Sequence, residues 1–178
     1  MKVIINNARL SFPSLFKTEE YGGADTGKYG ATFLIPKSDE ATIKAIKAAM
    51  KEVAEAEFGK PLPKNLGTCL KDGDDKEYDG YADHYSIKAT TKRRPVLVNR
   101  DKSPIAEDDG ILYAGCYVNA SLDIWAMNNQ YGKKVLASLN GIQFARDGES
   151  FGASNDSMDD FDELEPATAD AGEPDPFA

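Results

Sequence analysis

Hydrophobic and polar residues alternate along much of the chain, which is the pattern of half-buried β-strands. The clearest run lies within residues 111–127, where Val118, Leu122 and Ile124 fall on one face and Asn119 and Asp123 on the other. Other β-prone segments read VIINNARLSF, KYGATFLIP, HYSIKATTK, RRPVLVNRD and KKVLASLNGIQF, and the first of them is expected to end at Pro13. The pattern therefore predicts five to seven strands.

One segment has a helical period instead. Within residues 39–58, Ile43, Ile46 and Met50 recur every three or four positions, and Gly59 ends the pattern. The strands and this single helix show no βαβ alternation, and the remaining segments, residues 18–27 and 62–83, are expected to be irregular. We therefore predict a mainly β protein, a small antiparallel barrel or sandwich with one amphipathic helix (about 39–58).

Charge divides the chain into two parts. Residues 154–178 hold nine acids and no base, while the other 21 of the 30 acids balance all 21 Lys and Arg residues in residues 1–153. The net charge of −9 thus belongs to the end of the chain. We expect a folded domain at 1–153 followed by a disordered acidic C-terminal tail at 154–178, a type of segment that often serves in interactions.

The chain lacks the residues that several classes of enzyme and metal-binding protein need. The chain has one histidine, two widely spaced cysteines, and no nucleophile or phosphate-loop motif. We therefore predict no catalytic residue, no metal and no cofactor, with a nuclease or other enzyme as a minor alternative. The start of the chain has no secretory signal pattern, and no segment is apolar enough to span a membrane. The expected location is the host cytoplasm, with reduced thiols.

The neutral domain carries clustered cations and aromatic residues, which are the two components of a single-strand nucleic-acid site. Cations follow the phosphates, and aromatic faces stack on the bases. The cations that we select for phosphates are Lys28, Lys88, Lys92, Arg93, Arg94, Lys133 and Lys134. The aromatics that we select for stacking are Tyr29, Tyr85, Tyr117 and Trp125. For each one the alternative is structural: an aromatic in the core, or a charge on a solvated loop.

The acidic segment offers two further roles. Carboxylates tethered to a basic groove compete with phosphates, because the tether gives them a high effective concentration. The segment also combines acids with aromatic residues, as expected for partner binding; the residues selected are Asp159, Asp160, Phe161, Asp162, Asp175 and Phe177. A second hypothesis is therefore a protein-interaction adaptor, in which this segment recruits partners and the barrel is only a scaffold.

Six blocks carry a resemblance to a known family. In order, they read NNARLSFPSLF, YGATFLIPK, YDGYADHYSIKA, RRPVLVNRD, YAGCYVNASLDIWAM and LNGIQFARDGESFG, and they span roughly residues 4–152. The series resembles a family of bacteriophage single-stranded DNA-binding proteins, formerly a domain of unknown function. The resemblance implies an OB-fold barrel and a role in phage DNA replication or recombination. The acidic end resembles the tails with which replicative single-strand binders recruit polymerases, helicases or primases. Pairing of two chains through a sheet edge stays open.

Overall fold

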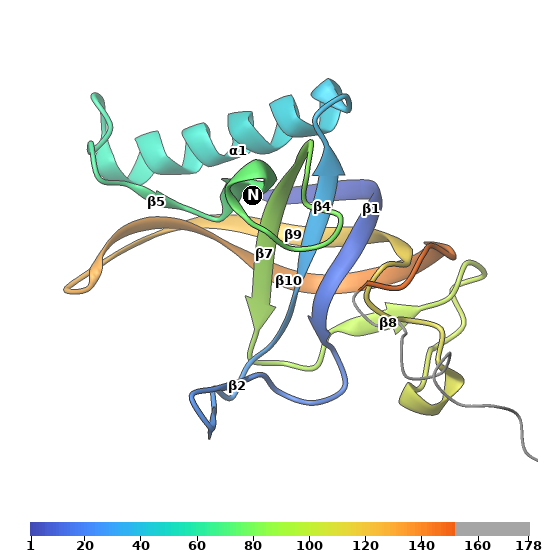
Figure 1. Cartoon of the computed structure of the whole chain (residues 1–178). Helices are drawn as coiled ribbons and strands as arrows, with labels where there is room; N and C mark the ends of the chain where they lie inside the picture. Colours follow the sequence, from blue (N-terminus) through green and yellow to red (C-terminus); the bar gives the residue numbers. More distant parts are fainter. Residues whose placement is uncertain (152–178) are drawn as a thin grey trace, which may run out of the picture.

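The computed structural model describes residues 1–151, so the predicted disordered tail at 154–178 lies outside the described residues. Figure 1 shows a curved sheet with one long helix across one end. The strands are β1 (Lys2–Ser14), β2 (Glu20–Tyr21), β3 (Ala24–Asp25), β4 (Tyr29–Pro36), β5 (Gly67–Thr68), β6 (Leu70–Asp72), β7 (His84–Thr91), β8 (Val96–Val98), β9 (Tyr117–Asn129) and β10 (Gly132–Arg146). The helices are α1 (Glu40–Phe58) and the 3₁₀ turns η1 (Gly73–Asp75) and η2 (Glu107–Asp109).

The main sheet closes into a barrel. Its strands run in the order β5-β10-β9-β1-β4-β7-β6, with β8 attached to β10. Strand β10 also pairs with β7, placing Ser138 opposite Thr90, and this contact joins two distant parts of the sheet. Most neighbours are antiparallel. The prediction of a mainly β, OB-fold-like barrel with one helix is thereby confirmed.

The alternation within residues 111–127 arises because β9 has one face in the barrel core. Val118, Leu122 and Ile124 are fully buried, and β9 continues into an antiparallel hairpin with β10. The turn of this hairpin is held by the Tyr131 amide, which donates a hydrogen bond to Asn129 Oδ1 at 2.8 Å. The tip extends beyond the barrel wall, and we refer to residues 125–136 as the hairpin arm (Figure 1).

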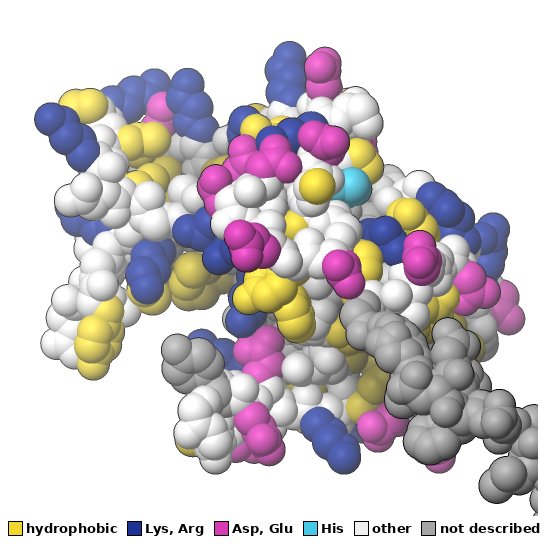
Figure 2. All heavy atoms as spheres, in the orientation of Figure 1, with side chains coloured by type: hydrophobic (Ala, Val, Ile, Leu, Met, Phe, Trp, Pro, Cys, Tyr) yellow, Lys and Arg dark blue, Asp and Glu magenta, His cyan; other side chains and the backbone are white. Residues whose placement is uncertain are grey.

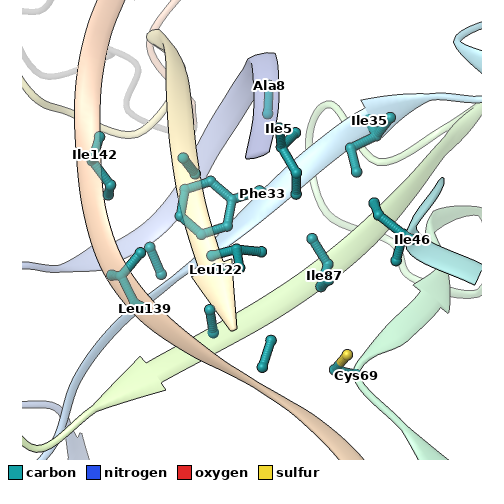
Figure 3. Packing of buried hydrophobic residues seen from close by; sticks show 14 of the residues in the cluster. Ile5, Ala8, Phe33, Ile35, Ile46, Cys69, Ile87, Leu122, Leu139 and Ile142 are labelled. Carbon is teal, nitrogen blue, oxygen red and sulfur yellow. The ribbon is translucent and has the colours of Figure 1, made fainter. Parts of the chain in front are cut away.

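Helix α1 covers one end of the barrel, as its periodicity predicts. Asp39 caps the helix by accepting a hydrogen bond from the Thr42 amide at 3.3 Å. Ile43 and Ile46 are buried in the same cluster as the barrel interior. Figure 3 shows Phe33, which is 0 % exposed, surrounded by other apolar side chains of this core. The Phe33 ring is therefore part of the core and is not accessible to a ligand.

Two segments expected to be irregular have regular structure. Residues 62–83 contain β5, β6 and η1, because Leu70 pairs opposite Ile87 and is buried against the core. Residues 18–27 form the small β2–β3 hairpin, with Glu20 opposite Asp25. Neither segment alternates for long enough to be recognised in sequence, since each strand has only two or three residues.

Two strand ends also differ from the prediction. The strand within residues 111–127 begins only at Tyr117, after Gly115 at φ +113°. The opening strand does not stop at Pro13 but continues to Ser14, because a bulge between Ser11 and Ser14 accommodates the proline.

Candidate nucleic-acid interface

A groove of about 650 Å³ runs between the outer face of the barrel and the hairpin arm. Its residues come from β1, β4, β5, β6, β7, β9 and β10 and from the loops before β4 and before β7. Figure 2 shows this face hollowed between the arm and the rest of the body, with Lys and Arg side chains near the hollow. The groove is thus assembled from segments that are distant in sequence.

The floor of the groove consists of small hydroxyl side chains. Strand β7 alternates so that Ser86, Lys88 and Thr90 face the groove while Ile87 and Ala89 are buried in the core. Thr32, which pairs with Lys88 across β4 and β7, adds a further hydroxyl. Short polar side chains leave open space above the sheet and offer hydrogen bonds, so the floor can receive a polar ligand.

Lysines are the only charged residues among the described side chains that line the groove. They are Lys28, Lys71, Lys76, Lys88 and Lys134. Within residues 1–151, only Lys88 of these five makes a salt bridge, with Glu19 at 3.5 Å. Five positive charges gathered along one concave surface raise the local concentration of an anion and favour its binding.

The walls also include a neutral thiol. Cys69 is buried, its Sγ lies 3.9 Å from the Met50 sulfur, and burial raises the pKa of the Cys69 thiol to about 11. The thiol therefore carries no negative charge at pH 7 that would oppose the lysines. Cys69 and Cys116 are both free and buried.

Trp125 stands on the hairpin arm at one side of the groove. It is 41 % exposed, and its indole Nε1 donates to Ser138 Oγ at 2.9 Å. This bond satisfies the polar edge of the ring and restrains its orientation. Trp125 thus presents an aromatic surface in a defined position beside the lysines, as a stacking residue must.

A second group of aromatics lies near the other side of the groove. Phe12 and Tyr78 are exposed, and Tyr81 beneath them is buried, with its hydroxyl 2.9 Å from Ser11 Oγ. Burial raises the pKa of the Tyr81 phenol, so Tyr81 stays neutral. The ring centroids of Phe12 and Tyr78 are 5.0 Å apart.

The structure brings four of the selected residues into the groove. Lys28, Lys88, Lys134 and Trp125 all line it, although they come from three separate parts of the chain. Their common location is a geometric finding, and contact of each residue with a ligand stays a prediction.

Two of the selected tyrosines lie elsewhere. Tyr85 is on the opposite face of β7 from Lys88, half-buried near α1, with Lys47 Nζ 4.9 Å from its ring centroid. Tyr117 packs against Arg9 and Arg146, whose guanidinium carbons lie 5.6 and 3.7 Å from the ring centroid. Both rings already have cationic partners within the protein.

The remaining selected residues also lie outside the groove lining. The run at residues 92–94 is exposed in the turn after β7, where the Arg94 guanidinium lies 5.9 Å from the Phe16 ring. Lys133 faces α1, with Nζ 5.6 Å from the Phe58 ring. Tyr29 is half-buried at the start of β4. The tail residues Asp159, Asp160, Phe161, Asp162, Asp175 and Phe177 are outside the described residues.

Four exposed cationic or aromatic residues of the groove were not selected from the sequence. Lys71 and Lys76 belong to the acid-rich segment that was expected to be irregular, and Phe12 and Tyr78 belong to an expected strand end and loop. Of these four residues, only Phe12 could have been recognised from the sequence, because it is an aromatic residue directly before a proline at the end of an expected strand.

Comparisons with known proteins find relatives over most of the chain. The family model described as the ssDNA-binding protein of Enterobacter phage Enc34 matches residues 1–172. A protein named p50, from Acyrthosiphon pisum secondary endosymbiont phage 1, is 44 % identical over 174 residues, which cover 92 % of this chain and 94 % of p50.

Solved structures give the same result. The single-stranded DNA-binding protein of bacteriophage Enc34, in complex with ssDNA, is 30 % identical with a TM-score of 0.72, and the match covers 85 % of this chain and 89 % of that one. The single-stranded DNA-binding protein gp2.5 of bacteriophage T7 has a TM-score of 0.60 at 13 % identity, over 92 % of this chain and 98 % of gp2.5, and so shares the fold. This chain belongs to the family of phage single-stranded DNA-binding proteins typified by that of Enterobacter phage Enc34.

Proposed function

We propose that this protein binds single-stranded DNA in the groove, with little sequence preference, during phage DNA replication or recombination in the host cytoplasm. The observation that carries the proposal is the groove itself, which has five lysines, no acidic residue in its described lining, and an exposed Trp125 face. Lysines neutralise phosphates of any sequence, and every base has a face on which an aromatic ring can stack. The binding requires no catalysis.

The test uses the single tryptophan of the chain as a reporter. A labelled oligonucleotide of roughly 20 to 30 nucleotides, longer than the roughly 4 to 16 nucleotides that one OB-fold occupies, is titrated while anisotropy and Trp125 fluorescence are recorded. We expect saturable binding that weakens with salt, quenching of Trp125, and weaker binding to a duplex of the same sequence. Absence of binding at low salt, or equal affinity for the duplex, would contradict the proposal.

We further propose that the nine acids of residues 154–178 limit DNA access to the groove. Phe151, the last described residue, packs at Gly80 in the loop that carries Tyr78, and its amide donates to Ala114 at 3.0 Å. The first of these acids, Asp156, is five residues further on and can extend roughly 17 Å from that point. The attachment next to the groove supports competition between carboxylates and phosphates.

Deletion of residues 154–178 tests this role. We expect tighter single-strand binding at low salt and convergence of the two proteins at high salt, because salt screens the competing charges. A deletion that weakens binding, or leaves it unchanged at low salt, would contradict autoinhibition.

The same acidic segment is proposed to recruit a replication protein such as a polymerase, helicase or primase. Replacement of Phe177 by Ala keeps all nine acids, so it separates partner binding from competition with DNA. We expect loss of partner binding with unchanged DNA affinity. If wild-type protein bound such a partner but no DNA, the adaptor hypothesis would replace the DNA-binding one.

A further inference from the structure

Phe12 has a backbone conformation that large side chains rarely adopt. Its φ is +45°, and among residues 1–151 the other non-glycine residues with positive φ are Asn7, Asp83 and Lys102. Asn and Asp tolerate this region, whereas a bulky aromatic residue in it is strained. Such strain persists only where the surrounding structure imposes it, and it concentrates at functional sites.

The strain has a clear structural cause, the bulge in β1. Ser11 pairs with Thr32 and Ser14 pairs with Gly30, so β1 has one residue more than β4 between these points. In a regular strand, Phe12 would lie on the same face as the buried Leu10. The extra residue instead places Phe12 on the groove side, 58 % exposed. The fold thus moves a phenylalanine out of reach of the core.

Tyr78 completes the arrangement. It is 53 % exposed and meets Phe12 edge to face, with an interplanar angle of 77°. Tyr78 in turn lies 5.2 Å from Tyr81, which is buried and hydrogen-bonded to Ser11. The edge-to-face contact leaves ring faces open, and Tyr81 fixes the pair to the barrel.

We propose that Phe12 and Tyr78 form a platform on which an unpaired nucleobase stacks, a proposal that rests on the proposed function. The pair lies in the same groove as Lys28, Lys76 and Lys88, which suit the phosphates on either side of a stacked base. Bases in a duplex have both faces covered by their neighbours, so they cannot use the platform. Phe12 and Tyr78 therefore contribute to the preference for single strands, at the side of the groove away from Trp125.

The experiment compares Phe12→Gly, Tyr78→Ala and Tyr78→Phe with wild-type protein, and uses Tyr131→Ala as the matched control. Tyr131 is also an exposed aromatic residue, 78 % accessible at the tip of the arm, but it does not line the groove. Glycine accepts a φ of +45° without strain, and this relief offsets part of the packing lost with the ring, so Phe12→Gly should remain folded, which a thermal melt checks. A binding loss in that variant cannot then be attributed to unfolding.

We expect Phe12→Gly and Tyr78→Ala each to weaken single-strand binding by roughly 5- to 150-fold, the range for loss of one stacked base. The salt dependence should stay as in the wild type, since no phosphate contact is lost. Tyr78→Phe and Tyr131→Ala should bind like the wild type. Unchanged affinity in Phe12→Gly and Tyr78→Ala would overturn the platform, and so would a loss as large in Tyr131→Ala. Failure of wild-type protein to bind would instead refute the proposed function.

Discussion

The two groups of positive side chains on this protein are assembled in different ways. The run at residues 92–94 is consecutive and lies in the turn after β7, and Arg94 rests on Phe16. The groove lysines come from distant segments, with Lys28 before β4, Lys88 in β7 and Lys134 in β10. Consecutive charges in a turn point in different directions into solvent, whereas the sheet aligns the groove charges on one concave surface. Charge density along a sequence is therefore a poor guide to charge density in space.

The strongest test of this contrast is a pair of triple variants that remove the same amount of charge. Lys28→Gln, Lys88→Gln and Lys134→Gln together should lower the salt slope of single-strand binding by about 2, since each phosphate contact contributes roughly 0.7. That change corresponds to about 100-fold weaker binding at 0.1 M salt. Replacing the three cations of residues 92–94 by Gln should cost less than about 5-fold, because exposed charges act weakly beyond the Debye length.

Anisotropy titrations at several salt concentrations measure both quantities, and thermal melts confirm that each triple variant is folded. Equal losses in the two variants, or a larger loss in the turn variant, would show that the DNA follows the turn and not the groove. The sequence-based choice of residues 92–94 would then be the better one.

A second test compares two aromatic residues that were selected on the same grounds. Trp125→Ala should weaken single-strand binding by about 1 to 3 kcal/mol with an unchanged salt slope, and Trp125→Phe should recover most of the loss. Tyr117→Ala should leave the affinity unchanged, because its ring is occupied by Arg9 and Arg146. Equal effects of Trp125→Ala and Tyr117→Ala in the titration would mean that the groove is not the stacking site.

Most of the fold follows from local sequence patterns. The helix could be predicted because Asp39 caps it and its apolar residues have the helical period. Strand β9 could be predicted because four buried positions alternate without interruption. The short strands β5 and β6 could not, since their pairing depends on partners far away in the chain. The bulge at Phe12 has the same origin, because it exists only in the register between β1 and β4.

The site was predictable only where strand alternation could be applied correctly. Lys133 and Lys134 are neighbours in a strand and must face opposite sides, so they cannot share one groove. The structure places Lys134 in the groove and Lys133 against Phe58. Tyr85 lies opposite Lys88 on β7 for the same reason. Composition indicated a basic and aromatic surface. Which residues belong to it depends on which face of the strand each side chain occupies.

The smallest expected effect concerns Lys88, the one groove lysine that forms an ion pair with another residue of the described range 1–151. Lys88 Nζ lies 3.5 Å from Glu19, whose carboxylate also sits against Gly30, where no side chain interferes. A phosphate near Lys88 must compete with this carboxylate. Glu19→Gln should therefore tighten single-strand binding by roughly 2- to 5-fold at low salt, the range for an ion pair at the protein surface, and the gain should vanish at high salt.

The matched control is Glu20→Gln, which removes the same charge from the adjacent residue of the β2–β3 hairpin. Titration of both variants with single-stranded DNA separates the release of Lys88 from the effect of a lower net negative charge. An equal gain in Glu20→Gln would mean that only the net charge matters, and a loss in Glu19→Gln would mean that Glu19 positions Lys88 for DNA. A gain confined to Glu19→Gln would identify Lys88 as a phosphate contact that the DNA-free protein holds in an ion pair. The other four groove lysines make no salt bridge within residues 1–151, so this gain is specific to Lys88.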